Sequence, residues 1–143
     1  MTSSTGTGKS LIELKVPNQP EFLRVIRLMV SGYMSRLPIS IEDVENAKVA
    51  VSEACNNAMQ YAFAPDEEGT LTVRCWHGGD RLVFEVSDSG RGFDASDDSA
   101  LPESQDDERG LGFLLIQTLM DDVQVDSAPD KGTTVTMTRM LNN

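Results

Sequence analysis

The chain is poor in positive charge: 12 lysines and arginines stand against 23 aspartates and glutamates, a net charge of −11 at pH 7. Binding to the phosphate backbone of a nucleic acid requires clustered basic residues, so a direct nucleic-acid partner is not expected. A nucleotide is not excluded, because it needs only a few local hydrogen-bond donors and a metal ion. Net charge alone says little about which protein surfaces would bind.

Long apolar runs and secretory signals are also lacking. No stretch approaches the roughly 20 residues that span a bilayer, so we expect no membrane partner and a cytoplasmic protein. Cysteine and histidine are scarce as well. Cys55 and Cys75 are too far apart in the chain for a metal motif and are expected to be buried free thiols. The single histidine, His77, is expected to be a surface turn residue rather than a metal ligand.

What is present fits one domain with its own core, since the chain has 143 residues. Residues 1–10 are small and polar and are expected to be disordered, which leaves 11–143 as the domain. Alternating and helical periodicities predict five strands and three helices. The predicted strands are 11–16, 71–76, 81–88, 123–127 and 133–140. The predicted helices are 20–36, 41–63 and 111–120.

The order of these elements indicates the fold class. Helices share the chain with antiparallel strand pairs and do not alternate with parallel strands. The sequence therefore predicts an α+β fold, a two-layer sandwich with helices on one face of a mixed, mostly antiparallel sheet. Residues 94–108 form an acidic stretch without periodicity, and a loop of that length is usually functional or disordered.

Two polar residues of the predicted helix 41–63 lie one turn apart. Glu53 and Asn57, at positions i and i+4, project from the same side of the helix. The asparagine offers a neutral oxygen to magnesium (Mg²⁺), which binds oxygen ligands and keeps several waters. The glutamate could accept a proton from an attacking hydroxyl or water, help that is worth roughly 10²–10⁴ in rate. The alternative is a solvated polar face with a chance spacing.

Asp88 ends a predicted strand and enters the segment DSGRG. A carboxylate fixed there can accept a hydrogen bond from an exocyclic amine such as that of adenine. Gly90 and Gly92 let the chain bend and let the backbone approach a flat ring. Thr133 or Thr134, at the start of the last strand, could bond the base or orient Asp88. An ordinary strand-ending turn and the strand propensity of threonine are the alternatives.

A second glycine-bearing segment, ERGLGF, precedes the last predicted helix. Gly110 and Gly112 would expose backbone N–H groups at the helix start, where the helix dipole favours anions. Arg109 could add charge-assisted hydrogen bonds to phosphate. The preceding loop could close over the phosphates as a lid, although its acidic end is unusual for that role.

Taken in order, these motifs resemble the GHKL ATPase superfamily and, within it, the bacterial anti-sigma-factor serine/threonine kinases. SEACNNA resembles the N-box of that family, DSGRGFD its first glycine box, ERGLGFLLIQTLMDDV its second, and SAPDKGTTVTMT its closing strand pair. The resemblance spans about residues 11 to 141. It implies the Bergerat ATP-binding fold and a serine/threonine protein kinase that uses ATP and Mg²⁺. It also implies phosphorylation of an anti-anti-sigma protein, binding of a sigma factor, and a homodimer.

The same resemblance assigns roles to individual residues. It implies that Glu53 is the catalytic base and that Asn57 binds the metal and the nucleotide. The further nucleotide contacts are Asp88, Gly90, Gly92, Arg109, Gly110, Leu111, Gly112, Phe113, Thr133 and Thr134. Arg24 is a candidate partner contact, with a solvated helix arginine as the alternative. Tyr61, where many relatives have histidine, and the acidic loop depart from the family pattern, so an ATP-binding module without kinase activity is the alternative function.

Overall fold

The computed structural model describes residues 9–63, 67–90, 92 and 108–141. Along the chain these form β1 (Lys9–Pro17), the 3₁₀ turn η1 (Pro20–Phe22), α1 (Leu23–Met34), α2 (Ile41–Tyr61), β2 (Thr70–Gly78), β3 (Arg81–Asp88), α3 (Glu108–Leu119), β4 (Asp122–Ser127) and β5 (Thr133–Met140). The predicted order of strands and helices is confirmed, with boundaries that differ by a few residues. Of the loop expected at 94–108, only Glu108 is described, and it begins α3.

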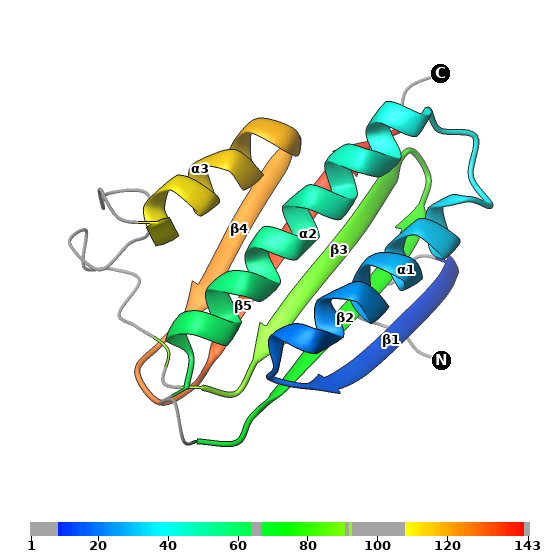
Figure 1. The fold of residues 1–143 in the computed structure, drawn as a ribbon. Coiled ribbons are helices and arrows are strands. Elements are labelled where there is room, and N and C mark those ends of the chain that lie inside the picture. Colours follow the sequence, from blue (N-terminus) through cyan, green and yellow to red (C-terminus); the bar gives the residue numbers. More distant parts are fainter. Residues whose placement is uncertain (1–8, 64–66, 91, 93–107, 142–143) are drawn as a thin grey trace.

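The five strands form one sheet in the order β1-β2-β3-β5-β4. All three helices lie on one face of this sheet (Figure 1). The expected two-layer α+β sandwich is therefore confirmed. The sheet is more uniform than the mixed sheet that we expected, because each of its four described pairings is antiparallel. The strand β5 lies between β3 and β4, which brings the end of β3 beside the start of β5.

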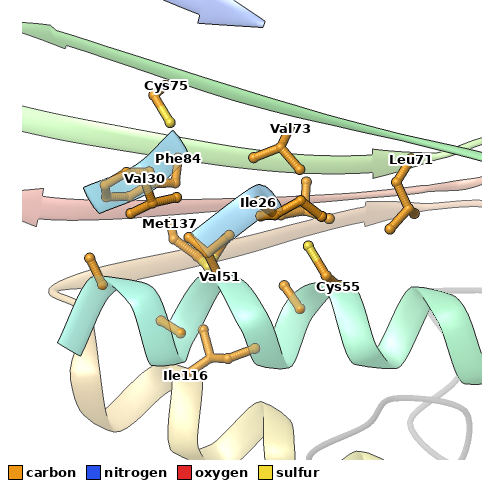
Figure 2. Close-up of a cluster of buried hydrophobic side chains, with 14 of the residues drawn as sticks. Ile26, Val30, Val51, Cys55, Leu71, Val73, Cys75, Phe84, Ile116 and Met137 are labelled. Atoms are coloured by element: carbon orange, nitrogen blue, oxygen red, sulfur yellow. The ribbon is translucent and has the colours of Figure 1, made fainter. Parts of the chain in front are cut away.

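The helix α2 crosses the middle of the sheet and supplies the centre of the core. Ser40 caps its start by accepting a hydrogen bond from the backbone N–H of Asp43 at 3.0 Å. Figure 2 shows Val51 and Cys55 of α2 directed toward the strands. Both are buried, as is Phe84 of β3. Because the residues on this side of α2 are small, the helix packs closely against the sheet.

The two thiols behave as the sequence predicts. Cys55 on α2 and Cys75 on β2 are both buried and free. Burial raises the pKa of each thiol to about 12. In the part of the chain that the structure describes, no group of three or more histidine, cysteine, aspartate or glutamate side chains could hold a metal ion. Nor is any helix in that part long and apolar enough to cross a membrane.

His77 differs from the expectation of a surface turn residue. It belongs to the end of β2, just before the turn in which Gly79 has a φ of +60°. Its side chain is half-buried, and its Nδ1 atom lies 3.1 Å from the hydroxyl of Tyr33 on α1. The helix layer reaches this end of the sheet, and periodicity along the strand gives no indication of that contact.

Candidate functional site

A pocket opens between α2, the end of β3 and the start of β5. Its lining residues are Ala54, Asn57, Ala58, Tyr61, Ala62, Val86, Asp88, Gly92, Phe113, Val125, Thr133 and Val135. Most of the wall is apolar, and the polar groups are few. Such a wall with a small number of placed polar groups is typical of a small-molecule site. Five of the site residues predicted from the sequence line this pocket: Asn57, Asp88, Gly92, Phe113 and Thr133.

Asp88 is the carboxylate of this pocket and is held by its own backbone surroundings. The backbone N–H of Gly90 donates to its Oδ1 atom at 2.8 Å, and the backbone of Thr133 provides a second hydrogen bond. Burial raises the pKa of Asp88, and these two hydrogen bonds oppose the rise. A half-buried, oriented acceptor of this kind suits recognition of an amine on a flat ring.

The glycines around Asp88 allow the chain to approach itself. Gly92 has a φ of +63°, and a side chain there would strike the carbonyl oxygen of Ala128 in the β4–β5 turn. At Gly90 a Cβ atom would lie 2.7 Å from Cβ of Ala62, at the end of α2. The sequence predicts that these glycines let the chain bend and let the backbone approach a flat ring. The structure shows that they also close the pocket against its own walls.

Gly132 is a residue that the sequence reading missed. Its φ is +78°, and a side chain at this position would strike the carbonyl oxygen of Asp88. It therefore holds the β4–β5 turn against the end of β3. The glycine immediately before Thr133 was visible in the sequence, but its contact with Asp88 depends on strand pairing.

Glu53 and Asn57 face the first turns of α3. A Cβ atom added at Gly112 would lie 2.8 Å from Oε1 of Glu53 and 3.7 Å from Oδ1 of Asn57. The two oxygens that the sequence placed one turn apart thus converge on the glycine of the second glycine-bearing segment. Glu53 is half-buried and belongs to none of the ion pairs among the described residues. Its carboxylate is therefore available to a bound group.

The remaining predicted residues are placed differently. Thr134 pairs with Ser87 on the sheet face away from the helices, and their hydroxyls lie 3.0 Å apart, so Thr134 does not line the pocket. Leu111 is 63% exposed and does not line it either. Arg109 and Gly110 belong to the first turn of α3, but the side chain of Arg109 lies outside the described part.

Seven further residues of the wall were not predicted as contacts, and three of them come from strands far apart in the chain. Val86, Val125 and Val135 lie on β3, β4 and β5 and form the apolar floor. In the sequence they read only as alternating strand residues. Tyr61, which the sequence analysis noted as a departure from the pattern of the resembling family, also lines the pocket.

Comparisons with known protein families place this geometry in context. A histidine kinase-like ATPase domain matches residues 16–139. The serine-protein kinase RsbW of Bacillus licheniformis is 44% identical over 139 residues, which cover 92% of this chain and 86% of that protein. The serine-protein kinase RsbW of Bacillus subtilis (strain 168) is 41% identical over 139 residues, with the same coverage.

Solved structures agree on the fold. A crystal structure of the RsbU and RsbW domains of a Mycobacterium tuberculosis protein matches 94% of this chain and 34% of that chain, with a TM-score of 0.70 and 18% identity. The histidine kinase domain of a blue-light activated histidine kinase from Erythrobacter litoralis matches 98% of this chain and 66% of that chain. Its TM-score is 0.62 at 21% identity. At these identities the likeness concerns the arrangement of the backbone.

Proposed function

This chain belongs to the histidine kinase-like ATPase domain family, and from that premise we propose that it is a serine-protein kinase and an anti-sigma factor. It uses ATP to phosphorylate an anti-anti-sigma protein. The single observation that carries the proposal is the position of Gly112, which lies against the oxygens of both Glu53 and Asn57. A base, a metal-binding oxygen and the start of a helix therefore meet beside an apolar pocket.

The adenine ring fits the apolar end of the site. Asp88 is held by the backbone of Gly90 and Thr133, so its carboxylate can accept a hydrogen bond from the exocyclic amine of the base. Valines of the floor and small residues of α2 supply flat apolar contacts. Gly92 and Phe113 border the same space and are proposed as further contacts with the nucleotide.

The phosphates then extend toward the first turns of α3. Backbone N–H groups and the helix dipole favour negative charge at the start of a helix. Arg109, Gly110, Leu111 and Gly112 belong to this part of α3, and we propose that their backbone contacts the phosphates. The absence of a Cβ atom at Gly112 leaves room between the helix and the oxygens of α2.

Asn57 is the proposed magnesium ligand. Its Oδ1 atom is neutral and lies at the pocket wall near Gly112. Mg²⁺ is commonly bound by one or two protein oxygens together with substrate phosphates and water, so a dedicated cluster of carboxylates is not required. When bound, the ion would neutralise charge on the phosphates.

Glu53 is the proposed general base. The acceptor hydroxyl of the protein substrate gives its proton to the Glu53 carboxylate as its oxygen forms a bond with the γ-phosphorus. The bond between that phosphorus and the oxygen bridging to ADP breaks, and ADP leaves with the electron pair. Glu53 has no ion-pair partner among the described residues, so no fixed cation competes for its carboxylate.

A direct test uses the protein with labelled ATP, Mg²⁺ and a purified anti-anti-sigma protein. We expect label on a serine or threonine of that substrate. Binding of ATP without transfer to any candidate partner would contradict the kinase and favour an ATP-dependent binding module. We further propose a homodimer and a cytoplasmic location, and sedimentation of the purified protein measures the first of these.

Replacement of Asp88 by Asn should weaken nucleotide binding without loosening the fold. Loss of a charged acceptor for the adenine amine should reduce the affinity for Mg-ATP about tenfold to hundredfold, measured by calorimetric titration. The pKa of Asp88 is higher in the folded protein than in the unfolded chain. The carboxyl therefore stabilises the fold at pH values below its unfolded-state pKa, and this stabilisation is lost as the pH rises through its folded-state pKa. The unliganded Asp88→Asn protein should therefore be as stable as the parent at pH 7, or more stable.

Asp80 provides a control for this substitution. It lies in the exposed β2–β3 turn, at the opposite end of β3 from Asp88. Asp80→Asn removes the same charge and should leave the affinity for Mg-ATP unchanged. Equal affinities in the two variants would contradict the proposed contact between Asp88 and adenine.

A further inference from the structure

A second hollow lies beside the nucleotide pocket, between α1 and α2. We call it the α1–α2 groove, and its lining residues are Arg27, Glu45, Lys48, Val49, Ser52 and Glu53. Glu53 lines the groove, and its Oε1 atom faces Gly112 of α3. A group bound in the groove would therefore approach the proposed base from outside the nucleotide pocket.

Arg27 is the fixed cation of this groove. Its Nε atom donates a hydrogen bond of 2.8 Å to Oγ of Ser52, a side chain that is only 4% exposed. A guanidinium has five N–H donors, so this bond leaves four of them for other partners. Within the described ranges Arg27 forms no ion pair with a carboxylate. Ser52 precedes Glu53 in the chain, so the cation is tethered next to the base.

The other charges of the groove are already matched. Lys48 and Glu45 form an ion pair with an N–O distance of 3.1 Å. Arg27 is therefore the groove cation that lacks a carboxylate partner in the described part of the chain. Arg27 is exposed to solvent, although the chain as a whole carries a net charge of −11.

Exposed apolar side chains on the same two helices add a second kind of contact. Leu28, next to Arg27 on α1, is 66% exposed, and Val25 is 43% exposed. Val49, on the groove wall, is 41% exposed. Val49 lines the groove together with Arg27, and an arginine beside exposed apolar surface is typical of a protein interface. This combination suits a folded protein or peptide segment better than a small anion.

We propose that the α1–α2 groove binds the acceptor-bearing segment of the protein substrate, and that Arg27 pairs with an acidic side chain next to the acceptor hydroxyl. The inference rests on the proposed kinase function and adds the chemistry by which the substrate is recognised. The proposed nucleotide pocket lies on the α3 side of α2, and the groove gives the acceptor a separate approach to Glu53. Pairing at Arg27 then brings its hydroxyl within reach of the carboxylate.

The test separates substrate binding from catalysis. Arg27→Met removes the charge and keeps a side chain of similar length. We expect the KM for a purified anti-anti-sigma protein, and its Kd measured in the presence of an unreactive ATP analogue, to rise roughly tenfold or more. The kcat at saturating substrate and the Kd for Mg-ATP should change less than about twofold, because no proposed nucleotide contact is altered.

Arg81→Met is the matched control, since it removes the same charge from an exposed residue at the far end of β3. Arg81→Met should leave the KM and the Kd for the anti-anti-sigma protein unchanged. Arg27→Lys keeps the charge but cannot reproduce both the Ser52 bond and a forked carboxylate contact, so it should give an intermediate rise. It also serves as the second variant if Arg27→Met fails to fold.

A double-mutant cycle completes the design. Acidic residues that flank the acceptor of the substrate are replaced singly by their amides, and one of them should lose its effect in the Arg27→Met background. Additive effects at every position, or an unchanged Kd in Arg27→Met, would overturn the groove proposal while leaving kinase activity intact. Arg27-dependent binding without label transfer would instead support the groove and reject the kinase.

Discussion

Glu53→Gln is expected to lower phosphoryl transfer to the protein substrate by roughly 10²–10⁴-fold, the range over which a positioned general base contributes. The amide keeps the size of the side chain, so the pocket and the groove should retain their shapes. It cannot accept the proton of the acceptor hydroxyl at neutral pH. The affinity for Mg-ATP should remain close to that of the parent, since the adenine contact at Asp88 is untouched.

Single-turnover measurements with enzyme in excess over substrate check this expectation directly, because they report the transfer step without product release. Glu42→Gln is the control, as it removes the same charge from an exposed residue in the first turn of α2. Transfer at the parental rate in Glu53→Gln would show that another group accepts the proton. Loss of ATP binding in the same variant would show that Glu53 has a structural role at the pocket.

Gly112→Ala is expected to leave the protein folded and to reduce transfer by about 10²-fold, the effect of misplacing a catalytic group by about 1 Å. The added Cβ atom would lie 2.8 Å from Oε1 of Glu53, which is closer than the two atoms can approach. That oxygen is the free end of a flexible side chain and can move at little cost. Stability should rise by roughly 0.5–1 kcal/mol, because alanine is preferred to glycine inside a helix.

Gly32→Ala provides the comparison for this variant. Gly32 lies in α1, and no atom would come within 4 Å of an added Cβ. It should show the same gain in the free energy of unfolding, measured by denaturant titration, with unchanged transfer. If Gly112→Ala is both stable and fully active, the first turns of α3 do not set the position of the base.

Local patterns in the sequence were enough to predict the order of the strands and helices and many residues of the candidate site. Alternation and helical spacing located the strands and helices. Glu53 and Asn57 could be paired because a helix places positions i and i+4 together. Asp88 could be singled out because it ends a strand just before two glycines.

Strand pairing decided which residues face the pocket. Thr133 and Thr134 are equivalent candidates in the sequence, but the register of β5 against β3 puts Thr133 opposite Asp88 and Thr134 opposite Ser87. Neighbouring side chains on a strand point to opposite faces, so only one of the two threonines can line the pocket.

Contacts between segments far apart in the chain also decided what the glycines and Arg27 do. The lack of space at Gly112 depends on how α3 packs against α2, and that at Gly132 depends on the pairing of β5 with β3. The bond from Arg27 to Ser52 joins residues 25 positions apart on two helices. Periodicity is a property of neighbouring residues and determines which local structures form. Distances between those structures are set only when the helices and the sheet bury their apolar faces together, and the tertiary structure alone supplies them.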